Sequence, residues 1–287
     1  MPAFETLFSS VNRWECDEND HLNVQFYFTR FEEADRQFRL LSGLSDALVG
    51  SRRVRHVRYH CELRCGAMIT GRSFIAFDGP HMLTVVHELR EGDRLAATAV
   101  DGYSPPESKI RELRRRFRDA ENAMPETAAP RGLPATVPAL KATPEALIRA
   151  GAAVVNRSTV LQRDLGPDGR ADDGFALGRF TEAAPHIWAR TPMAPDWLAE
   201  RGLGRVAVEM KLAWAGPLKL GDPVVVISGL TGASNTIFSF RHHMFEARAN
   251  RLAAVCDVVA LAMDLDTRKA VPLEPEVRKA IASMVLS

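Results

Sequence analysis

The feature that most constrains this chain is a helical repeat of apolar side chains that begins at Val24. Gly43 follows the repeat as a stop signal, because glycine readily adopts the left-handed conformation that ends a helix. The apolar residues recur at spacings of three and four, which places them on one helix face; they are Val24, Tyr27, Phe31, Ala34, Phe38 and Leu41. The sequence therefore predicts a long helix over 24–41, entered from a polar segment that starts at Trp14.

Short extended runs flank this helix and predict an antiparallel sheet. They are separated by turn signals at 78–80 and 91–93. The predicted strands are Thr6–Trp14 before the helix and Val54–Leu63, Gly71–Phe77, Met82–Leu89 and Leu95–Val100 after it. The first half of the chain is thus predicted to contain one strand, one long helix and four further strands.

The second half repeats this order of elements. The first strand is predicted at Val155–Arg163, and a shorter helix follows at Phe175–Trp188, which Pro185 is expected to kink or end. Four more strands are predicted after it, at Arg205–Ala213, Pro223–Leu230, Thr236–Phe245 and Leu252–Met263. The segment 93–97 (DRLAA) resembles 250–254 (NRLAA), and each opens the last strand of its half. We interpret the chain as a duplicated module.

The two halves are separated by a segment of different composition. A charged helix is predicted over Glu107–Ala120, and prolines then recur among alanine and threonine from Pro125 to Pro144, as in an extended linker. The predicted organisation is therefore an N-terminal domain at 1–103, a helix and linker at 104–152, and a C-terminal domain at 153–287. Helices and antiparallel strands together make the fold class α+β.

Composition excludes several classes of protein. Lys plus Arg number 37 against 36 Asp plus Glu, so no strong field for nucleic acid or a membrane surface is expected. No apolar run approaches the ~20 residues that span a bilayer, and the N-terminus lacks the features of a signal peptide. The four cysteines form no CxxC pair, which argues against a zinc site. We expect a cytoplasmic protein without a metal.

Three polar residues gather where the long helix begins. Asp17, His21 and Asn23 offer a carboxylate, an imidazole and a carboxamide, and the helix behind them is apolar. This arrangement suits chemistry on a carbonyl compound with an apolar tail. Each residue also has a structural interpretation, since Asp17 and Asn23 are ordinary helix caps and His21 can bond the backbone.

These residues carry a resemblance to a known family. Asp17, His21, Asn23 and Tyr27, followed by Phe-Glu-Glu-Ala at 31–34, resemble the signature of hotdog-fold acyl-CoA thioesterases of the 4-hydroxybenzoyl-CoA thioesterase type. The segments PLKLGD at 217–222 and DLDTRKAVPLEP at 264–275 are similar to segments of that family. Asp20 stands where the family usually has glycine. In the second half, the signature aligns loosely, with Ala171 at the Asp place, Gly174 at the Gly place and Phe175 at the His place.

The resemblance implies two fused hotdog domains, each a long helix wrapped by an antiparallel sheet, with the second carrying a degenerate motif. Fusion would make the usual hotdog pair intramolecular, and further homo-oligomerisation stays open. The implied activity is hydrolysis of an acyl thioester without a cofactor, coenzyme A being part of the substrate. Asp17 would act as general base or nucleophile, and His21 and Asn23 would position the substrate or the water.

The resemblance also assigns the remaining site residues. The amides of Asp20, Leu22 and Val24 would bind the oxyanion, Tyr27 and Phe31 would line the acyl pocket, and coenzyme A phosphates would meet a basic segment at Arg52, Arg53 and Arg55. Two alternatives stay open. One is a hotdog enoyl-thioester hydratase or dehydratase, although its Asp and His lie five apart around Asn-Pro and here they lie four apart without proline. The other is a non-catalytic protein that binds acyl thioesters.

Overall fold

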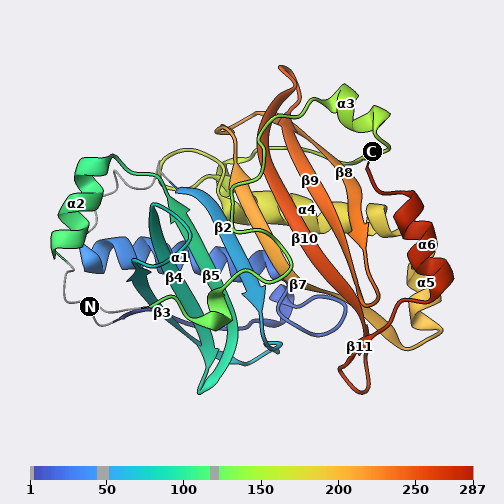
Figure 1. The fold of residues 1–287 in the computed structure, drawn as a ribbon, viewed down its shortest axis with the longest axis horizontal. Coiled ribbons are helices and arrows are strands. Elements are labelled where there is room, and N and C mark those ends of the chain that lie inside the picture. The colour runs from blue at the N-terminus through green and yellow to red at the C-terminus, as the bar shows by residue number, and fades with distance from the viewer. Residues whose placement is uncertain (1–2, 44–51, 117–122, 287) are drawn as a thin grey trace. The chain divides into compact units, whose positions relative to one another are not determined.

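The chain divides into two compact units, Met1–Val137 (unit 1) and Pro138–Ser287 (unit 2). The structure, a computed structural model, describes residues 3–43, 52–116 and 123–286. Each unit contains a long helix and an antiparallel sheet, so the predicted α+β class and the two repeated modules are confirmed (Figure 1). No helix among the described residues is long and apolar enough to cross a membrane.

Unit 1 follows the predicted order of elements. Its elements are β1 (Phe4–Ser10), a 3-10 turn η1 (Arg13–Glu15), α1 (Val24–Ser42), β2 (Arg52–Tyr59), β3 (Met68–Ala76), β4 (Leu83–Glu91) and β5 (Arg94–Tyr103). The strands pair antiparallel in the order β1-β3-β4-β5-β2. The first predicted strand was too long, because the chain turns into η1 before Trp14.

The helix α1 begins and ends as the sequence predicts. The side-chain oxygen of Asn23 caps it by accepting the amide of Gln25 at 3.0 Å, and Gly43 ends it in the left-handed conformation with φ 66°. Its buried face includes Phe31 and Phe38, both 0% exposed. The apolar period therefore reports the packing of α1 on the sheet.

The segment after β5 lies against unit 1. The charged helix is α2 (Glu107–Arg116), and the rest of its predicted range, 117–120, falls outside the described residues. A 3-10 turn η3 (Glu126–Ala128) then packs on the sheet, where Arg58 donates to the carbonyls of Glu126 and Ala129 at 3.0 and 2.8 Å. Ala128 is 4% exposed and packs in an apolar cluster with Val86. This part of the proline-rich segment is thus bonded to the sheet of unit 1.

Unit 2 repeats the arrangement and adds short helices. Its elements are α3 (Pro144–Arg149), β6 (Ala153–Thr159), η4 (Gln162–Asp164), α4 (Asp173–Trp188), α5 (Pro195–Ala199), β7 (Leu203–Trp214), β8 (Pro223–Ala233), β9 (Ile237–Glu246), β10 (Arg251–Asp264), β11 (Ala270–Val271) and α6 (Pro275–Ser283). The strands pair in the order β7-β10-β9-β8-β6, with β11 on β10. Pro185 lies inside α4 and does not end it.

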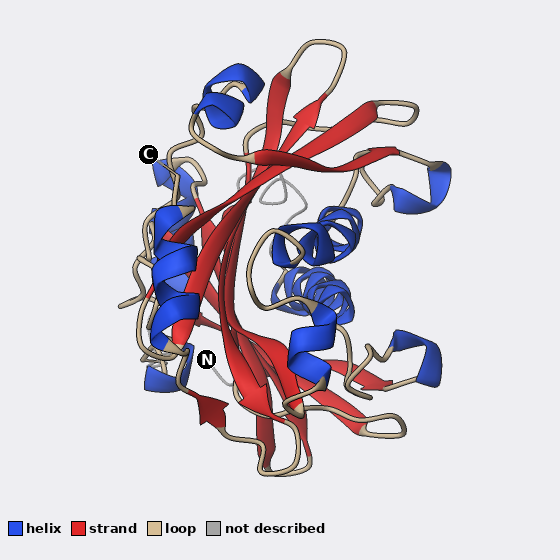
Figure 2. Cartoon of the chain, turned by 90° about the vertical axis from the view of Figure 1, so that its right-hand side faces the viewer, coloured by secondary structure: helices blue, strands red, loops and turns tan. Residues whose placement is uncertain are grey.

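The short helices α3, α5 and α6 were not predicted from the sequence. Each begins with proline in its first turn, a position that needs no amide donor. They are five to nine residues long, too short to show an apolar period. Figure 2 colours the helices blue and the strands red, and α3, α5 and α6 are labelled in Figure 1. The contacts place α3 and α6 against β8 and α5 against β7.

Truncation of Phe38 tests the packing of α1. The ring is fully buried and meets Phe4 edge-on at 5.8 Å between ring centroids. We expect Phe38→Ala to lower the free energy of unfolding by about 3 to 5 kcal/mol, measured by denaturant titration. Leu40→Ala on the same helix is the control, because Leu40 is 73% exposed and its truncation should change stability little. Equal losses in both variants would contradict the packing described for α1.

Candidate active site

Asp17 anchors a tight turn that leads into α1. Its Oδ1 accepts the amides of Asn19 at 2.9 Å and His21 at 3.2 Å, and its own amide donates to the carbonyl of His21 at 2.8 Å. Within the described parts of the chain, the second oxygen, Oδ2, has no hydrogen-bond donor. The carboxylate is therefore fixed through one oxygen while the other is available for chemistry.

Partial burial shifts the acidity of this carboxyl. Asp17 is half-buried, and the loss of hydration raises its pKa above the usual range for aspartate. The two amide bonds to Oδ1 and the nearby His21 oppose this shift, while the charge of Glu18 adds to it. Asp17 is thus a stronger base than an exposed aspartate.

His21 is held by a partner that the sequence did not indicate. Its Nε2 lies 3.0 Å from a carboxylate oxygen of Glu62, and the imidazole is 6% exposed. The backbone joins the same two segments, since the amide of Leu22 donates to the carbonyl of Leu63 at 2.8 Å and His21 forms a bridge with Arg64. Glu62 lies at the end of a predicted strand with no motif around it, so only the folded chain shows this pairing.

The backbone amides at the helix start differ in availability. The amide of Asp20 donates to the carbonyl of Asp17 at 3.1 Å, and that of Leu22 donates to Leu63. Neither is therefore open for the oxyanion role predicted for it. The amide of Val24, the first residue of α1, has no acceptor among residues 3–43, 52–116 and 123–286. Of the three predicted donors, Val24 alone combines an available amide with the helix N-terminus.

Asp20 takes the backbone conformation expected of the glycine it replaces. Its φ is 61°, in the left-handed region that glycine favours and aspartate tolerates better than most residues. The side chain points to solvent and pairs with Arg13 at 2.8 Å. The exchange of glycine for aspartate therefore keeps the path of the turn.

Tyr27 and Phe31 are buried, at 4% and 0% exposure. Burial raises the pKa of the Tyr27 hydroxyl well above its usual range, and its ring meets Tyr59 edge-on at 5.1 Å between centroids. The ring centroid of Phe31 lies 6.4 Å from that of His87 in the interior of unit 1. Both side chains belong to the packed interior, and their role as an acyl pocket stays a prediction.

The phosphate role predicted for Arg52 and Arg55 is not compatible with their contacts. Arg55 is 1% exposed, and its Nε donates to Asp101 Oδ1 at 2.8 Å while Nη1 donates to Glu32 at 3.1 Å. Arg52 donates to the same Glu32 at 2.9 Å. Both guanidinium groups neutralise buried carboxylates, so we withdraw them as phosphate ligands. Arg53 is exposed, and its role is untested.

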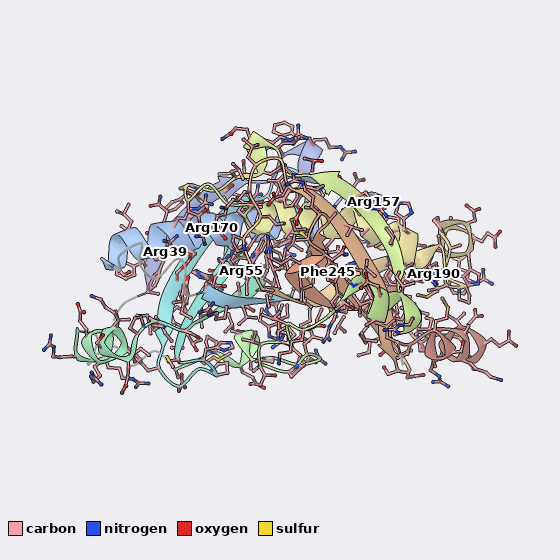
Figure 3. The ribbon with its side chains drawn as sticks, turned by 90° about the horizontal axis from the view of Figure 1, so that it is seen from above. Arg39, Arg55, Arg157, Arg170, Arg190 and Phe245 are labelled. Atoms are coloured by element: carbon pink, nitrogen blue, oxygen red, sulfur yellow. The ribbon has the colours of Figure 1, made fainter. Side chains whose placement is uncertain are left out.

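These ion pairs extend into a buried network beneath α1. Asp35 accepts a hydrogen bond from the Tyr103 hydroxyl and another from Arg39 Nε at 3.2 Å. His87 Nε2 lies 3.4 Å from Asp101 Oδ2, and its Nδ1 is 2.7 Å from Ser73 Oγ. Figure 3 labels Arg39 on α1 and Arg55 on β2, which approach the network from the helix and from the sheet.

The described residues contain one cluster whose donor atoms could suit a metal, formed by Asp35, His87 and Asp101. Its carboxylates already bind cationic or hydroxyl donors. Across the network, Glu32, Asp35 and Asp101 are balanced by three guanidinium groups, those of Arg39, Arg52 and Arg55. A divalent cation would add two uncompensated charges in a buried site, at a large electrostatic cost. The cluster is better explained as a neutral ion network.

Unit 2 contains the same turn without the acid. The bridge between Cys16 and Leu22 in unit 1 matches that between Leu165 and Ala171 in unit 2, and the helix caps Asn23 and Asp172 correspond.

This register places Gly166 where unit 1 has Asp17, Gly169 at the place of Asp20 and Arg170 at the place of His21. The sequence alignment through Ala171, Gly174 and Phe175 was therefore wrong by five residues. Unit 2 lacks both the acid and the histidine at this turn.

The interiors of the units also differ at matching positions. Phe31, Ser73 and His87 correspond to Phe180, Ser228 and His242, whose Oγ and Nδ1 atoms again form a serine–histidine pair. By helix position and strand register, however, Asp35, Arg55 and Asp101 correspond to Ala184, Met210 and Val258. Burial, with a further contribution from His243, lowers the pKa of His242 to about 3. The ion network is thus specific to unit 1.

Comparison with known proteins identifies the fold. Residues 172–281 match the model of the thioesterase-like superfamily. No curated protein matches the sequence significantly.

Among solved structures, the 12:0-ACP thioesterase from Umbellularia californica has a TM-score of 0.61 at 11% identity, over 91% of this chain and 94% of its own. A putative oleoyl thioesterase from Lactobacillus plantarum has a TM-score of 0.60 at 11% identity, over 90% and 95%. An acyl-ACP thioesterase from Bacteroides thetaiotaomicron has a TM-score of 0.56 at 9% identity, over 88% and 96%.

The chain therefore has the double hotdog fold that these solved thioesterases share, and the predicted resemblance is confirmed at the level of the fold and of the superfamily model over 172–281. The match to the superfamily lies in unit 2, whereas the acid, the histidine and the available helix amide lie in unit 1. Family pattern and candidate chemistry are thus carried by different halves of the chain.

Acid titration tests the ion network. Burial raises the pKa of the Glu32 and Asp101 carboxyls, but the adjacent guanidinium groups outweigh it, so both lie below their ordinary values, Glu32 at about 2. Carboxyls with depressed folded-state pKa stabilise the fold above their unfolded pKa of about 4 and lose this contribution as the pH falls. We expect the free energy of unfolding to fall steeply between about pH 5 and pH 2.

Substitution of one carboxylate should remove much of this dependence. Asp101→Asn should cost about 3 to 5 kcal/mol at pH 7, because it leaves buried guanidinium charge uncompensated, and should flatten the acid profile measured by urea unfolding. Asp266→Asn, at an exposed aspartate, is the control and should follow the wild-type profile. A wild-type profile in Asp101→Asn would contradict the network.

Proposed function

We propose that this protein hydrolyses an acyl thioester, with acyl-CoA as the substrate class. The observation that carries the proposal is the carboxylate of Asp17, fixed through one oxygen and open at the other, in the turn that leads into the N-terminus of α1. Thioester hydrolysis needs a base or nucleophile and a site for negative charge on the carbonyl oxygen. The turn and the helix start supply both within seven residues of sequence.

In the proposed mechanism, Asp17 Oδ2 takes a proton from water, which attacks the thioester carbon. Negative charge then builds on the carbonyl oxygen, where the amide of Val24 and the helix dipole stabilise it. The tetrahedral intermediate collapses to the free acid and a thiolate, and the thiolate takes the proton from Asp17, which restores the base. Direct attack by Asp17 to form a mixed anhydride, which water then hydrolyses, uses the same groups.

His21 and Asn23 have positioning roles in this mechanism. Glu62 fixes the imidazole of His21 beside the turn, so His21 would orient the thioester or the water. Asn23 Oδ1 caps α1 through Gln25, which leaves its amide nitrogen to contact substrate. The apolar face that starts with Tyr27 and Phe31 would receive the acyl group. No metal or organic cofactor is required by these steps.

The fold and the relatives support this proposal. Two similar structures are described as acyl-ACP thioesterases, so a carrier-protein thioester is the natural competitor of acyl-CoA as substrate. We further propose that the protein acts in the cytoplasm as an intramolecular hotdog pair; its four cysteines, all within described segments, are free thiols. The enoyl-thioester hydratase and the non-catalytic binding protein remain as the competing functions.

Substitution of Asp17 tests the mechanism. Release of free thiol is measured from short, branched, aromatic and long acyl-CoAs, with the matching acyl-carrier thioesters in parallel. We expect Asp17→Asn to lower kcat by about 10²- to 10⁴-fold, the usual contribution of a catalytic base, while acyl-CoA binding is kept. Asp266→Asn is the control, since Asp266 is an exposed aspartate in unit 2, away from the turn.

The same screen separates the competing functions. Unchanged turnover in Asp17→Asn would remove this residue from the mechanism. Binding without thiol release by the wild type would favour the non-catalytic protein, and hydration of an enoyl-CoA without thiol release would favour the hydratase.

The pH profile provides a second test. Because burial raises the pKa of Asp17 and the base acts deprotonated, activity should fall as the pH drops through a value above the ordinary aspartate pKa of about 3.9. The profile of kcat/KM between pH 4 and pH 9 measures this acid limb. A limb at or below the ordinary value would contradict the role given to Asp17.

A further inference from the structure

A buried ion pair lies directly behind the turn that carries Asp17. Arg30 Nη2 donates to Glu15 Oε2 at 2.8 Å, and their side chains are 7% and 11% exposed. Glu15 is the last residue of η1, two positions before Asp17, and Arg30 projects from the second turn of α1. The pair therefore connects the segment before the turn to the helix after it.

Both partners make further bonds that fix this connection. Glu15 Oε2 also accepts the backbone amide of Asn12 at 2.8 Å, and Arg30 donates to the carbonyls of Ser10 at 2.8 Å and Phe26 at 3.2 Å. The carbonyl of Glu15 accepts the amide of Asn23, the cap of α1, at 2.9 Å. Glu15 therefore bonds through its backbone to the cap of α1 and through its side chain to Arg30. These bonds hold together the two ends of the segment 15–23, which contains Asp17 and His21.

The charges of the pair persist at neutral pH. Burial raises the pKa of the Glu15 carboxyl, but the bonds from Arg30 and Asn12 outweigh it, so that the pKa lies below the usual range for glutamate. A buried ion pair contributes little net stability, because desolvation of both charges offsets their attraction. Stability alone therefore gives a weak reason for placing these charges here, and the precision of the turn gives a better one.

Unit 2 shows the same position without the pair. Asp164 corresponds to Glu15 and keeps its local bond, accepting the amide of Leu161 at 2.7 Å. Its side chain is one methylene shorter, and Arg179, the counterpart of Arg30, instead pairs with Glu182 at 2.8 Å. The link between turn and helix is therefore present in the unit with the acid and absent in the unit without it.

We propose that Glu15 and Arg30 are a positioning pair for the reaction, which holds Asp17 half-buried at the N-terminus of α1. The pair contacts neither the carboxylate oxygens of Asp17 nor the amide of Val24, so it acts through the backbone of the turn. This inference rests on the proposed function. Loss of the pair lets the turn move away from the helix, which exposes Asp17 to water and separates it from the site of the oxyanion.

The test compares Glu15→Gln and Arg30→Lys with Asp164→Asn and Arg179→Lys, the matched changes in unit 2. We expect the unit 1 variants to lose about 10- to 100-fold in kcat on the best acyl-CoA found for the wild type, as misplacement of a reacting group by about 1 Å does. KM should change less than threefold. The acid limb of the pH profile should move to lower pH, because a more hydrated Asp17 has a lower pKa. The unit 2 variants should keep wild-type kinetics.

The outcomes separate a positioning role from a structural one. Thermal unfolding gives the folded fraction of each variant, and a kcat that falls only in proportion to that fraction, with an unmoved acid limb, would overturn the proposal. Equal effects of the unit 1 and unit 2 changes would overturn it as well. If the wild type hydrolyses no acyl thioester, the proposed function fails. Carboxyl NMR then measures the pKa of Asp17 in the wild type and in Glu15→Gln. A lower pKa of Asp17 in the variant supports the positioning role, and an unchanged pKa rejects it.

Discussion

The packing of α1 on its sheet depends on the neutralisation of charge inside unit 1. The helix buries Asp35 and Arg39 on the same face as Phe31 and Phe38. Apolar contacts alone therefore cannot stabilise the packing of this face on the sheet. Guanidinium groups from β2 and a hydroxyl from β5 complete the ion network. A helix held in this way has one allowed rotation about its axis, because a small turn would leave charges unpaired in the interior. That restriction fixes where its N-terminus, and hence the turn with Asp17, must lie.

The two repeated units differ in the charged residues at the turn and beneath the long helix. Unit 2 keeps the 3-10 turn, the helix cap and the buried serine–histidine pair. It replaces the charged positions beneath the helix with Ala184, Met210 and Val258, and the acid of the turn with Gly166. Apolar residues at these three positions need no ion pairing, although unit 2 keeps a buried pair of Lys211 and Asp257 elsewhere. Unit 2 can therefore serve as a structural partner, while unit 1 retains the more demanding arrangement of charges.

The sequence predicted those features that local patterns determine. The apolar period and its flanking Asn23 and Gly43 located α1, and alternating runs located the strands. Contacts between distant segments left no such pattern. Nothing near Glu62 indicated its bond to His21, and the arginines of β2 resembled an exposed basic segment until their carboxylate partners on α1 and β5 were known. The loose alignment in unit 2 failed because hydrogen-bonded geometry, and not residue identity, defines the equivalent turn.

Asp20 illustrates what that distinction means for comparing sequences. The family signature is written with a glycine, yet the turn requires only a positive φ, which is 61° at Asp20 and 71° at Gly169. An exposed aspartate meets that requirement at modest conformational cost. A comparison of amino-acid sequences counts Asp20 as a mismatch to glycine, whereas a comparison of backbone dihedral angles counts the two positions as equivalent. Divergent members of such a fold are thus better compared by dihedral angles than by conserved glycines.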